Sequence, residues 1–220
     1  MKNLKIIASC LAFIAVIISL IVMNPINNDS KKFKEEYESL NKTHKPITIN
    51  KNNPIKYADY DEIVNLIKSG TGVIYFGFPE CPWCRNAVPV LLEAAEELEL
   101  KEIYYFNALD MRDIKKLDEN GKIVTTKEGT KEYYELVNLL SDYLGEYEGL
   151  NDKEIKRLYF PTVVFVKEGK VLGLNVSTVE SQLDPMVDLN EKQKAELKNI
   201  YETYMSQVLG ITCPITGNAC

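Results

Sequence analysis

The stretch FGFPECPWCRNAVPVL, residues 76–91, holds two cysteines, Cys81 and Cys84, two residues apart between a strand-like run and a helix-like run. The run GVIYFGF, which begins at Gly72, is short, apolar and rich in β-branched and aromatic residues, as in a buried strand. Apolar side chains then recur at helical spacing, which predicts a helix over about residues 82–99. The cysteine pair is therefore expected where a buried strand meets the start of a helix.

The flanking segments extend this pattern into an α/β domain. A second buried strand is predicted over residues 102–108, EIYYFNA, so that strand, helix and strand form a parallel βαβ unit. Before this unit, Asp59 can cap a helix together with Glu62, and Gly70 marks the end of that helix.

Two further elements follow near the C-terminus. The sequence FPTVVFVKEGKVLGLNV, residues 160–176, predicts an antiparallel hairpin around a tight turn. An amphipathic helix is expected to begin at a capping box of Asp188 and Glu191 and to end at Gly210.

Residues 110–159 interrupt the simple order of strands and helices. The segment is too long for a bare loop in a compact domain, which predicts an inserted, mainly helical segment. Within it, a helix is expected from a Thr130 cap to Gly145, and the Asn-Gly pair in residues 118–122 predicts a hairpin turn.

The N-terminus carries a membrane signal. Lys2 and Lys5 precede an uninterrupted apolar run, residues 6–23, which as a helix would span roughly 27 Å at about 1.5 Å per residue. Because lysines stay in the cytoplasm, residues 1–23 are expected to form a single-pass anchor in the cell membrane that exports the rest of the chain. A rival interpretation takes IASC as a lipoprotein box with a lipidated Cys10, although most of the apolar run follows that cysteine.

The segment after the anchor is ambiguous. Residues 24–56 are rich in Asn, Lys and Pro, which is typical of a tether. Phe33, Tyr37 and Leu40 nevertheless have helical spacing. A solvated stalk and a short docked helix both fit this pattern.

Composition excludes several functions. The formal net charge is −6 and no basic stripe interrupts the mixed charges, which excludes nucleic acid as a partner. The single histidine, His44, lies in the polar stretch NKTHKP, which leaves little room for serine–histidine catalysis or a histidine-rich metal site. No metal is expected.

A Cys-x-x-Cys pair at a helix start suits thiol chemistry, because unpaired backbone N–H groups and the helix dipole stabilise a thiolate there. The thiolate is the attacking species. Cys81, at the helix start and more exposed, is expected to attack a substrate disulfide, and the shielded Cys84 to resolve the mixed disulfide. Pro82 fits the first turn, and Trp83 either guides partners or covers the helix end.

Three separated features resemble the thioredoxin superfamily: CPWC after an apolar strand, Pro89 in the following helix, and FPT at residues 160–162 before the hairpin. The resemblance covers roughly residues 57–108 and 158–210. It implies a thioredoxin-like α/β domain over residues 57–210, with a central mixed sheet flanked by helices. An exported, anchored chain of this kind is also similar to the bacteriocin transport accessory proteins of Gram-positive bacteria.

The resemblance implies further roles. Pro161 would be cis and lie against the cysteines, and the backbone beside it, at Phe160, would pair with an extended substrate. No organic cofactor is implied, because the redox-active disulfide carries both electrons. Two positions depart from the family: Tyr75 stands where thioredoxins have a buried Asp that helps to move the resolving thiol's proton, and Glu80 precedes CPWC. Glu80 opposes a thiolate that the helix start favours, so the direction of electron flow stays open.

The remaining cysteines allow several interpretations. Cys213 and Cys220, in the tail of residues 211–220, are expected to form a structural disulfide, because the residues between them favour a turn and disulfides persist outside the cytoplasm. A sharper hypothesis makes them a relay to a membrane redox partner. Zinc bound by both pairs is an alternative, which the C-x6-C spacing of the second pair disfavours.

The sequence therefore predicts a membrane-anchored, extracytoplasmic thiol-disulfide oxidoreductase that acts on protein thiols and disulfides. The rival class is a non-catalytic thioredoxin-like binding module that assists peptide export, in which the insertion and the Trp83 surface bind a partner.

Overall fold

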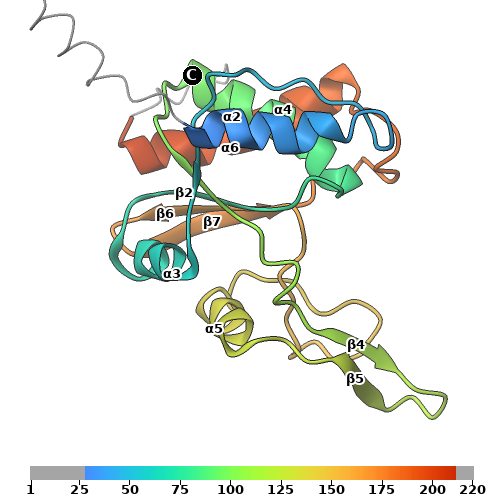
Figure 1. Cartoon of the computed structure of the whole chain (residues 1–220). Helices are drawn as coiled ribbons and strands as arrows, with labels where there is room; N and C mark the ends of the chain where they lie inside the picture. Colours follow the sequence, from blue (N-terminus) through green and yellow to red (C-terminus); the bar gives the residue numbers. More distant parts are fainter. Residues whose placement is uncertain (1–27, 212–220) are drawn as a thin grey trace, which may run out of the picture.

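The computed structural model describes residues 28–211 of the 220-residue chain. They form an α/β domain around a five-stranded mixed sheet with the strand order β1-β3-β2-β6-β7 (Figure 1). The strands are β1 (Ile55–Tyr57), β2 (Gly72–Phe76), β3 (Ile103–Phe106), β6 (Thr162–Lys167) and β7 (Lys170–Val176). β1, β2 and β3 run parallel, and the pairs β2–β6 and β6–β7 are antiparallel. The predicted βαβ unit and hairpin are both confirmed.

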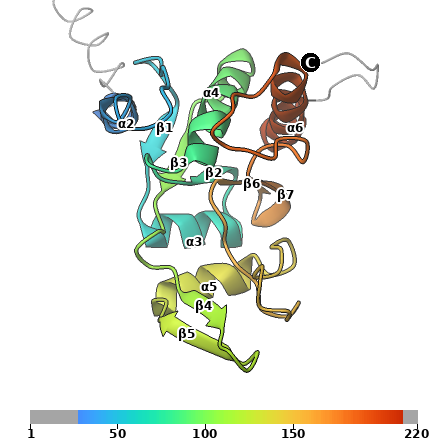
Figure 2. The same cartoon turned by 90° about the vertical axis from the view of Figure 1, so that its right-hand side faces the viewer.

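Helices cover both faces of the sheet. They are α2 (Asn28–Ser39), α3 (Tyr60–Ser69), α4 (Pro82–Glu97), α5 (Lys131–Leu139) and α6 (Glu191–Leu209). α2, α4 and α6 lie on one face, and α3 lies on the other with α5 beyond it (Figure 1, Figure 2). Alternate residues of β2 serve the two faces: Val73 and Tyr75 join the core under α2, α4 and α6, whereas Ile74 and Phe76 join the core under α3.

The helix ends follow the predicted chemistry with one exception. α3 has the predicted caps at both ends, and α6 ends at the predicted glycine in the left-handed conformation. The predicted start of α6 is wrong, because Asn190 is its N-cap and accepts a hydrogen bond from the Gln193 N–H at 3.0 Å. Asp188 is engaged elsewhere, since its carboxylate forms an ion pair with Lys45 at 2.6 Å.

The segment with two open interpretations is a docked helix. Phe33 and Tyr37 on α2 are fully buried in the core shared with α4 and α6. β1 then pairs with β3 and becomes an edge of the sheet. Within the described range, residues 28–56 are thus part of the folded domain and not a tether, so the domain begins before residue 57. The physical reason is the aromatic side chains, which supply the apolar surface that a solvated stalk would leave in water.

The insertion, residues 110–159, is not mainly helical. The predicted hairpin is present as β4 (Ile114–Leu117) and β5 (Ile123–Lys127), and the nine-residue α5 is followed by turns. α5 keeps its Thr130 cap but ends well before the predicted Gly145. The apolar stripe that predicted a longer helix is still buried, because Leu140 and Leu144 enter the core through consecutive turns.

Several predictions fall on residues 1–27 and 212–220, which lie outside the described residues. They are the anchor over residues 1–23, the lipidation of Cys10 and the pairing of Cys213 with Cys220. None of the helices within residues 28–211 is long and apolar enough to cross a membrane.

Candidate functional site

The cysteine pair lies at the junction of β2 and α4. Cys81 is the N-cap residue of α4, and its Sγ accepts a hydrogen bond from the Cys84 N–H at 3.2 Å. Pro82 occupies the first helical turn, where its missing N–H costs little. Both cysteines are free thiols in this structure. The Cys81 sulfur therefore satisfies one of the backbone donors that a helix start leaves unpaired.

Both cysteine side chains are buried. The Cys81 side chain is 4% exposed and Cys84 is 0% exposed, so only a small difference in access separates the two sulfurs. Cys81 shares a buried cluster with Phe160, and Trp83 is half-buried against the same cluster. Cys81 is thus the more exposed of the two, as expected, although both side chains are buried. Cys81 is covered by Phe160, which follows the insertion, and by residues of the CPWC turn itself.

The Phe160–Pro161 loop lies against the cysteine pair. The peptide bond between these residues is cis, as the family resemblance implies. The Cys81 thiol donates a hydrogen bond to the Phe160 carbonyl at 3.6 Å. Sheet register explains the contact, because Thr162 at the start of β6 is paired with Phe76 at the end of β2. Two segments about 80 residues apart in sequence therefore meet at the end of one strand pair.

The pKa values of the two cysteines are shifted in opposite directions. The pKa of Cys81 is lowered from its ordinary value, mainly by the hydrogen bond with the Cys84 side chain and further by the N–H groups of Cys84 and Trp83, against the raising effect of burial. Burial raises the pKa of Cys84 well above its ordinary value. Because the thiolate is the reactive form of a cysteine, these shifts make Cys81 the more reactive sulfur of the pair.

Arg112, in the insertion, is a site residue that the sequence analysis missed. Its guanidinium lies 5.0 Å from the centroid of the Phe160 ring, and its charge contributes to the lowered pKa of Cys81. The predicted βαβ unit could have indicated this position. Because β2 and β3 are parallel, the residues that follow β3 emerge at the same end of the sheet as CPWC. The insertion thus places a cation near the Cys81 sulfur.

Tyr75, which stands where the resemblance to thioredoxins predicts a buried Asp, lies in the interior of the domain. The side chain is fully buried, and its hydroxyl is 2.7 Å from the equally buried hydroxyl of Tyr37 on α2. Gly77 makes room for this ring, since a Cβ at that position would lie 2.2 Å from the Tyr75 oxygen. Tyr105 stacks on Tyr75 with ring centroids 5.5 Å apart.

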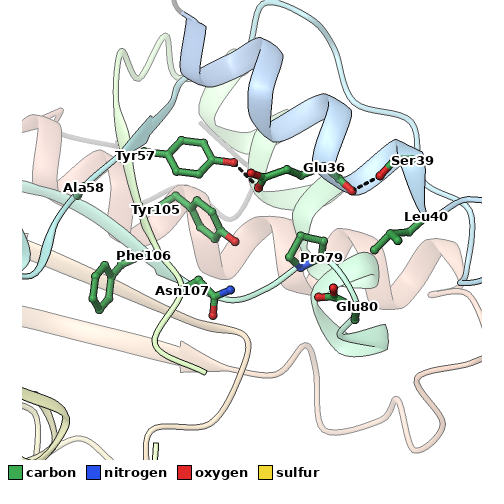
Figure 3. A pocket seen from close by; sticks show the side chains of 10 residues that line it. All are labelled: Glu36, Ser39, Leu40, Tyr57, Ala58, Pro79, Glu80, Tyr105, Phe106 and Asn107. Atoms are coloured by element: carbon green, nitrogen blue, oxygen red, sulfur yellow. Dashed lines mark hydrogen bonds between the residues drawn. The ribbon is translucent and has the colours of Figure 1, made fainter. Parts of the chain in front are cut away.

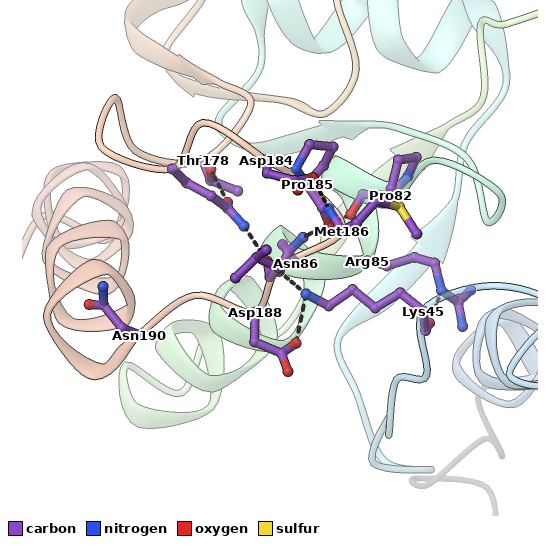
Figure 4. A network of polar contacts seen from close by, with 12 residues as sticks. Lys45, Pro82, Arg85, Asn86, Thr178, Asp184, Pro185, Met186, Asp188 and Asn190 are labelled. Carbon is purple, nitrogen blue, oxygen red and sulfur yellow. Dashed lines mark hydrogen bonds and ion pairs between the residues drawn. The ribbon is translucent and has the colours of Figure 1, made fainter.

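A polar network attaches the loop before α6 to the first turns of α4 (Figure 4). The Asn86 amide donates to the carbonyl oxygens of Pro82 at 3.0 Å and Pro185 at 2.7 Å. Lys45 donates to the Asn86 side-chain oxygen and forms the ion pair with Asp188. The loop beside the CPWC turn is therefore held by half-buried hydrogen bonds.

The same loop carries apolar side chains that are exposed to solvent. Leu183 is 88% exposed, and Met186 and Val187 are also exposed. Because the Pro185 carbonyl accepts a hydrogen bond from Asn86 on α4, the segment that carries these side chains runs beside the first turns of α4, and Figure 4 shows Met186 there. Together with the half-buried Pro82 and Trp83, they form the apolar part of the surface around the site.

An open hollow of about 550 Å³ lies behind the loop that joins β2 to α4 (Figure 3). It is lined by residues from α2, from β1 and β3 with the residues after them, and from the loop itself, among them Glu36, Tyr57, Glu80 and Tyr105. The Tyr57 hydroxyl donates to the Glu36 carboxylate at 2.5 Å. Tyr105 stands between this hollow and the Tyr75 ring on which it stacks.

Within residues 28–211, no three His, Cys, Asp or Glu side chains are arranged to hold a metal ion. Comparison with protein-family models and with curated protein sequences finds no match to this chain.

Proposed function

We propose that this chain is a thiol-disulfide oxidoreductase with a thioredoxin-like fold. One observation carries the proposal: Cys81 caps α4, has a lowered pKa, and touches the carbonyl that precedes the cis-proline. Cys84, one turn further and fully buried, is the resolving thiol. The βαβ unit with CPWC at its turn and the antiparallel hairpin after Pro161 support the fold assignment.

The proposed reaction is an exchange between two dithiol–disulfide pairs. The Cys81 thiolate attacks a substrate disulfide, forms a bond to one sulfur, and releases the other sulfur as a thiolate. Cys84 then attacks Cys81, forms the Cys81–Cys84 disulfide, and releases the second substrate thiol. The substrate is reduced by two electrons and the pair is oxidised by two. The reverse sequence oxidises a substrate dithiol, and no organic cofactor is required in either direction.

The setting proposed for this reaction is outside the cytoplasm. The apolar run in residues 6–23 with its preceding lysines supports a single-pass anchor, and an oxidising compartment suits a disulfide pair. Cys213 and Cys220 in the tail are proposed to form a structural disulfide. The substrates are protein thiols and disulfides.

The test is a trap for the mixed disulfide. In cells that produce the Cys84→Ala variant, Cys81 is expected to accumulate disulfide-linked partners that a reducing gel releases. The matched control, Cys81→Ala/Cys84→Ala, should trap none. If the single variant traps no partner, and the purified wild-type chain neither reduces nor oxidises model disulfides, the proposed activity is wrong.

The near-complete burial of Cys81 favours one second candidate, a non-catalytic thioredoxin-like module that binds a partner during peptide export. In that case the exposed loop around Met186 and the half-buried Trp83 are the binding surface. Partners would then be captured equally well by the wild type and by the variant without either cysteine, and the capture would survive reducing agent.

A further inference from the structure

We propose that the open hollow behind the loop that joins β2 to α4 binds a lysine or arginine side chain of the polypeptide substrate. This inference rests on the proposed function and deepens it, because it names a chemical feature of the favoured substrates. The hollow has a volume of about 550 Å³ and is lined in part by Pro79 and Glu80, the two residues before Cys81. Its volume is within the range of roughly 300 to 1,000 Å³ that is usual for ligand sites.

The charged side chains that line the hollow are both acidic. They are Glu36 on α2 and Glu80 on the loop, and no Lys, Arg or His of the described range is among the lining residues (Figure 3). Glu80 is exposed and has no ion pair or hydrogen bond with any residue in the range 28–211. The Glu36 carboxylate accepts a hydrogen bond from the Tyr57 hydroxyl, which holds it at the rim of the hollow. The ligand that complements this lining carries a positive charge.

A buried phenol without a partner points into the same space. Tyr105 on β3 is 3% exposed, yet its hydroxyl forms no hydrogen bond with the residues that the structure describes. Figure 3 shows this hydroxyl directed into the hollow, towards the side where Pro79 lies. Buried polar groups normally have a hydrogen-bond partner, and a phenol oxygen accepts hydrogen bonds from N–H donors. The position of Tyr105 therefore indicates a ligand that carries N–H groups.

The remaining wall suits a ligand with an apolar stem. Leu40, Pro79 and Phe106 line the hollow together with the two carboxylates. Lysine and arginine combine a chain of methylene groups with a cationic end that only donates hydrogen bonds. A metal ion fits less well, since no three His, Cys, Asp or Glu side chains within residues 28–211 are arranged to hold one.

Two cations of the protein lie near the hollow and leave it open. The Lys32 ammonium is 3.8 Å from the Glu36 carboxylate and 3.8 Å from the centroid of the Tyr57 ring. Its side chain is 56% exposed, and an exposed ion pair of this kind is weak. The Arg85 guanidinium is buried and donates to the Pro79 carbonyl at 2.9 Å. Neither side chain is among the residues that line the hollow.

The Asn107 amide provides a site for the main chain of the ligand. Its side-chain oxygen accepts a hydrogen bond from the Leu109 N–H at 3.0 Å, which leaves its NH₂ group free for another acceptor. Asn107 lines the hollow beside Tyr105 (Figure 3). A donor at this position does not suit a second cation, but it suits a carbonyl oxygen. Because each residue of a peptide has a carbonyl close to its side chain, a polypeptide fits the hollow better than a small amine.

A substrate bound in this way is held beside the proposed nucleophile. Glu80 directly precedes Cys81, so the carboxylate that binds the basic side chain belongs to the loop that carries the sulfur. Cysteines close to a lysine or arginine in the substrate are then positioned for exchange more often than others. The expected effect is a lower KM for such substrates.

Binding is tested without turnover in the variant Cys81→Ser/Cys84→Ser. Cysteine-free peptides of one length, with arginine, citrulline or glutamate at the centre, are titrated into the ¹⁵N-labelled chain and followed by NMR. The arginine peptide should bind with a Kd of about 1 mM or lower and shift the amide resonances of Glu80 and Tyr105. Citrulline has nearly the same shape without the charge, so its peptide should bind about tenfold more weakly. The glutamate peptide should not bind.

Substitutions in the hollow should weaken this binding. Glu80→Gln should raise the Kd of the arginine peptide about tenfold, because a charge-assisted contact is lost. Tyr105→Phe should raise it about threefold and leave the stability of the fold unchanged, since its hydroxyl has no internal partner. Glu154→Gln is the matched control, because it removes an exposed carboxylate of the insertion, and it should not change the Kd.

Turnover by the wild-type chain separates this inference from the proposed function. A disulfide peptide with arginine beside its cysteine should have a KM about tenfold lower than its citrulline counterpart, with the same kcat. Equal Kd values for the arginine and citrulline peptides, or for Glu80→Gln and Glu154→Gln, overturn the inference even if disulfides are reduced. Binding that is selective for arginine, without reduction or oxidation of any disulfide peptide, overturns the proposed function and shows that the hollow serves a binding module.

Discussion

At the scale of single residues, one helical turn gives two identical side chains different chemistry. Cys81 receives hydrogen bonds from the groups at the helix start, and these lower its pKa against burial. Cys84, three residues later, is behind the turn and burial dominates its pKa. The division of labour proposed for the pair therefore follows from position in the helix, because access to solvent hardly differs.

Arg112, the cation from the insertion, is predicted to lower the pKa of Cys81, the proposed nucleophile. Arg112→Ala should raise the pKa of Cys81 by roughly half a unit, because a positive charge near a thiolate is removed. Alkylation rate against pH, measured in the Cys84→Ala background, gives this pKa directly. Arg112→Lys should recover part of the shift, and Lys153→Ala, an exposed cation of the same insertion, should have no effect. Equal pKa values in Arg112→Ala and Lys153→Ala would contradict the assignment.

The same pKa has a consequence for stability. Because the folded-state pKa of Cys81 is lower than its unfolded value, its thiolate stabilises the folded chain at pH values above the unfolded pKa. This contribution is lost as the pH falls through the folded-state pKa. The contribution of Cys84 has the opposite sign. Because its folded-state pKa is raised, ionisation of Cys84 lowers the free energy of unfolding as the pH rises above the unfolded-state pKa.

At the scale of elements, α2 changes from a connecting segment into part of the core. Its aromatic rings pack on those of the sheet, with the Phe33 and Tyr105 centroids 5.1 Å apart. Arg85 on α4 holds the chain that leaves α2, since its guanidinium donates to the Tyr37 carbonyl at 3.0 Å and to the Asn41 side chain at 2.6 Å. α2 is therefore fixed to the helix that carries the cysteines.

Removing one ring of α2 tests whether this helix belongs to the core. Phe33→Ala should lower the free energy of unfolding by about 3 to 5 kcal/mol, because a fully buried ring leaves a cavity. Denaturant unfolding measures the change. Lys31→Ala, on the exposed side of α2, should stay within about 0.5 kcal/mol of the wild type. A neutral Phe33→Ala would restore the tether interpretation.

Arg85 is the buried cation that joins α2 to α4. Removing its charge should lower the free energy of unfolding more than replacing it with another cation. Arg85→Ala removes the guanidinium donor from the Pro79 and Lys45 carbonyls and one of two donors from the Tyr37 carbonyl, which should cost about 2 to 4 kcal/mol. Arg85→Lys should cost less, since one ammonium satisfies some of them. Hydrogen exchange is expected to show faster opening of α2 in Arg85→Ala. Lys101→Met, at an exposed site, is the control and should leave α2 unchanged.

At the scale of the whole molecule, the sheet separates an apolar core under three helices from a second core that faces the insertion. The insertion lies on the side of α3 (Figure 1, Figure 2). Glu135 on α5 accepts hydrogen bonds from Tyr60 at 2.6 Å and from Lys68 at 2.9 Å, which attaches the two parts. The proposed site lies near the edge of the sheet where both parts contribute side chains, Arg112 from one and Phe160 from the other.

The proposed membrane topology has a direct test at this scale. If residues 1–23 anchor the chain with its domain outside, protease added to intact cells should digest the domain and leave a cytoplasmic control protein untouched. A variant without residues 1–23 should be recovered in the soluble fraction and be protected in intact cells. A full-length domain that resists protease until the cells are lysed would contradict the topology.

The sequence by itself determined the elements around CPWC, because their signals are local. Strand composition, helical periodicity and capping residues act within a few positions, and they identified β2, α3, α4 and the β6–β7 hairpin. The same reasoning missed the true cap of α6, because Asp188 is held by Lys45, far away in sequence. It also overextended α5, since an apolar stripe does not distinguish a helix from turns that bury the same side chains.

Only the tertiary structure decided what surrounds the two sulfurs. That Cys81 is buried, that Arg112 lies near it, and that the Tyr37 hydroxyl meets the Tyr75 hydroxyl all depend on segments distant in sequence. No local propensity records such contacts, because they arise when strand register and helix packing bring separate segments to one place. The sequence therefore determined where the cysteine pair lies in the chain, and packing determined the proton affinity of each thiol.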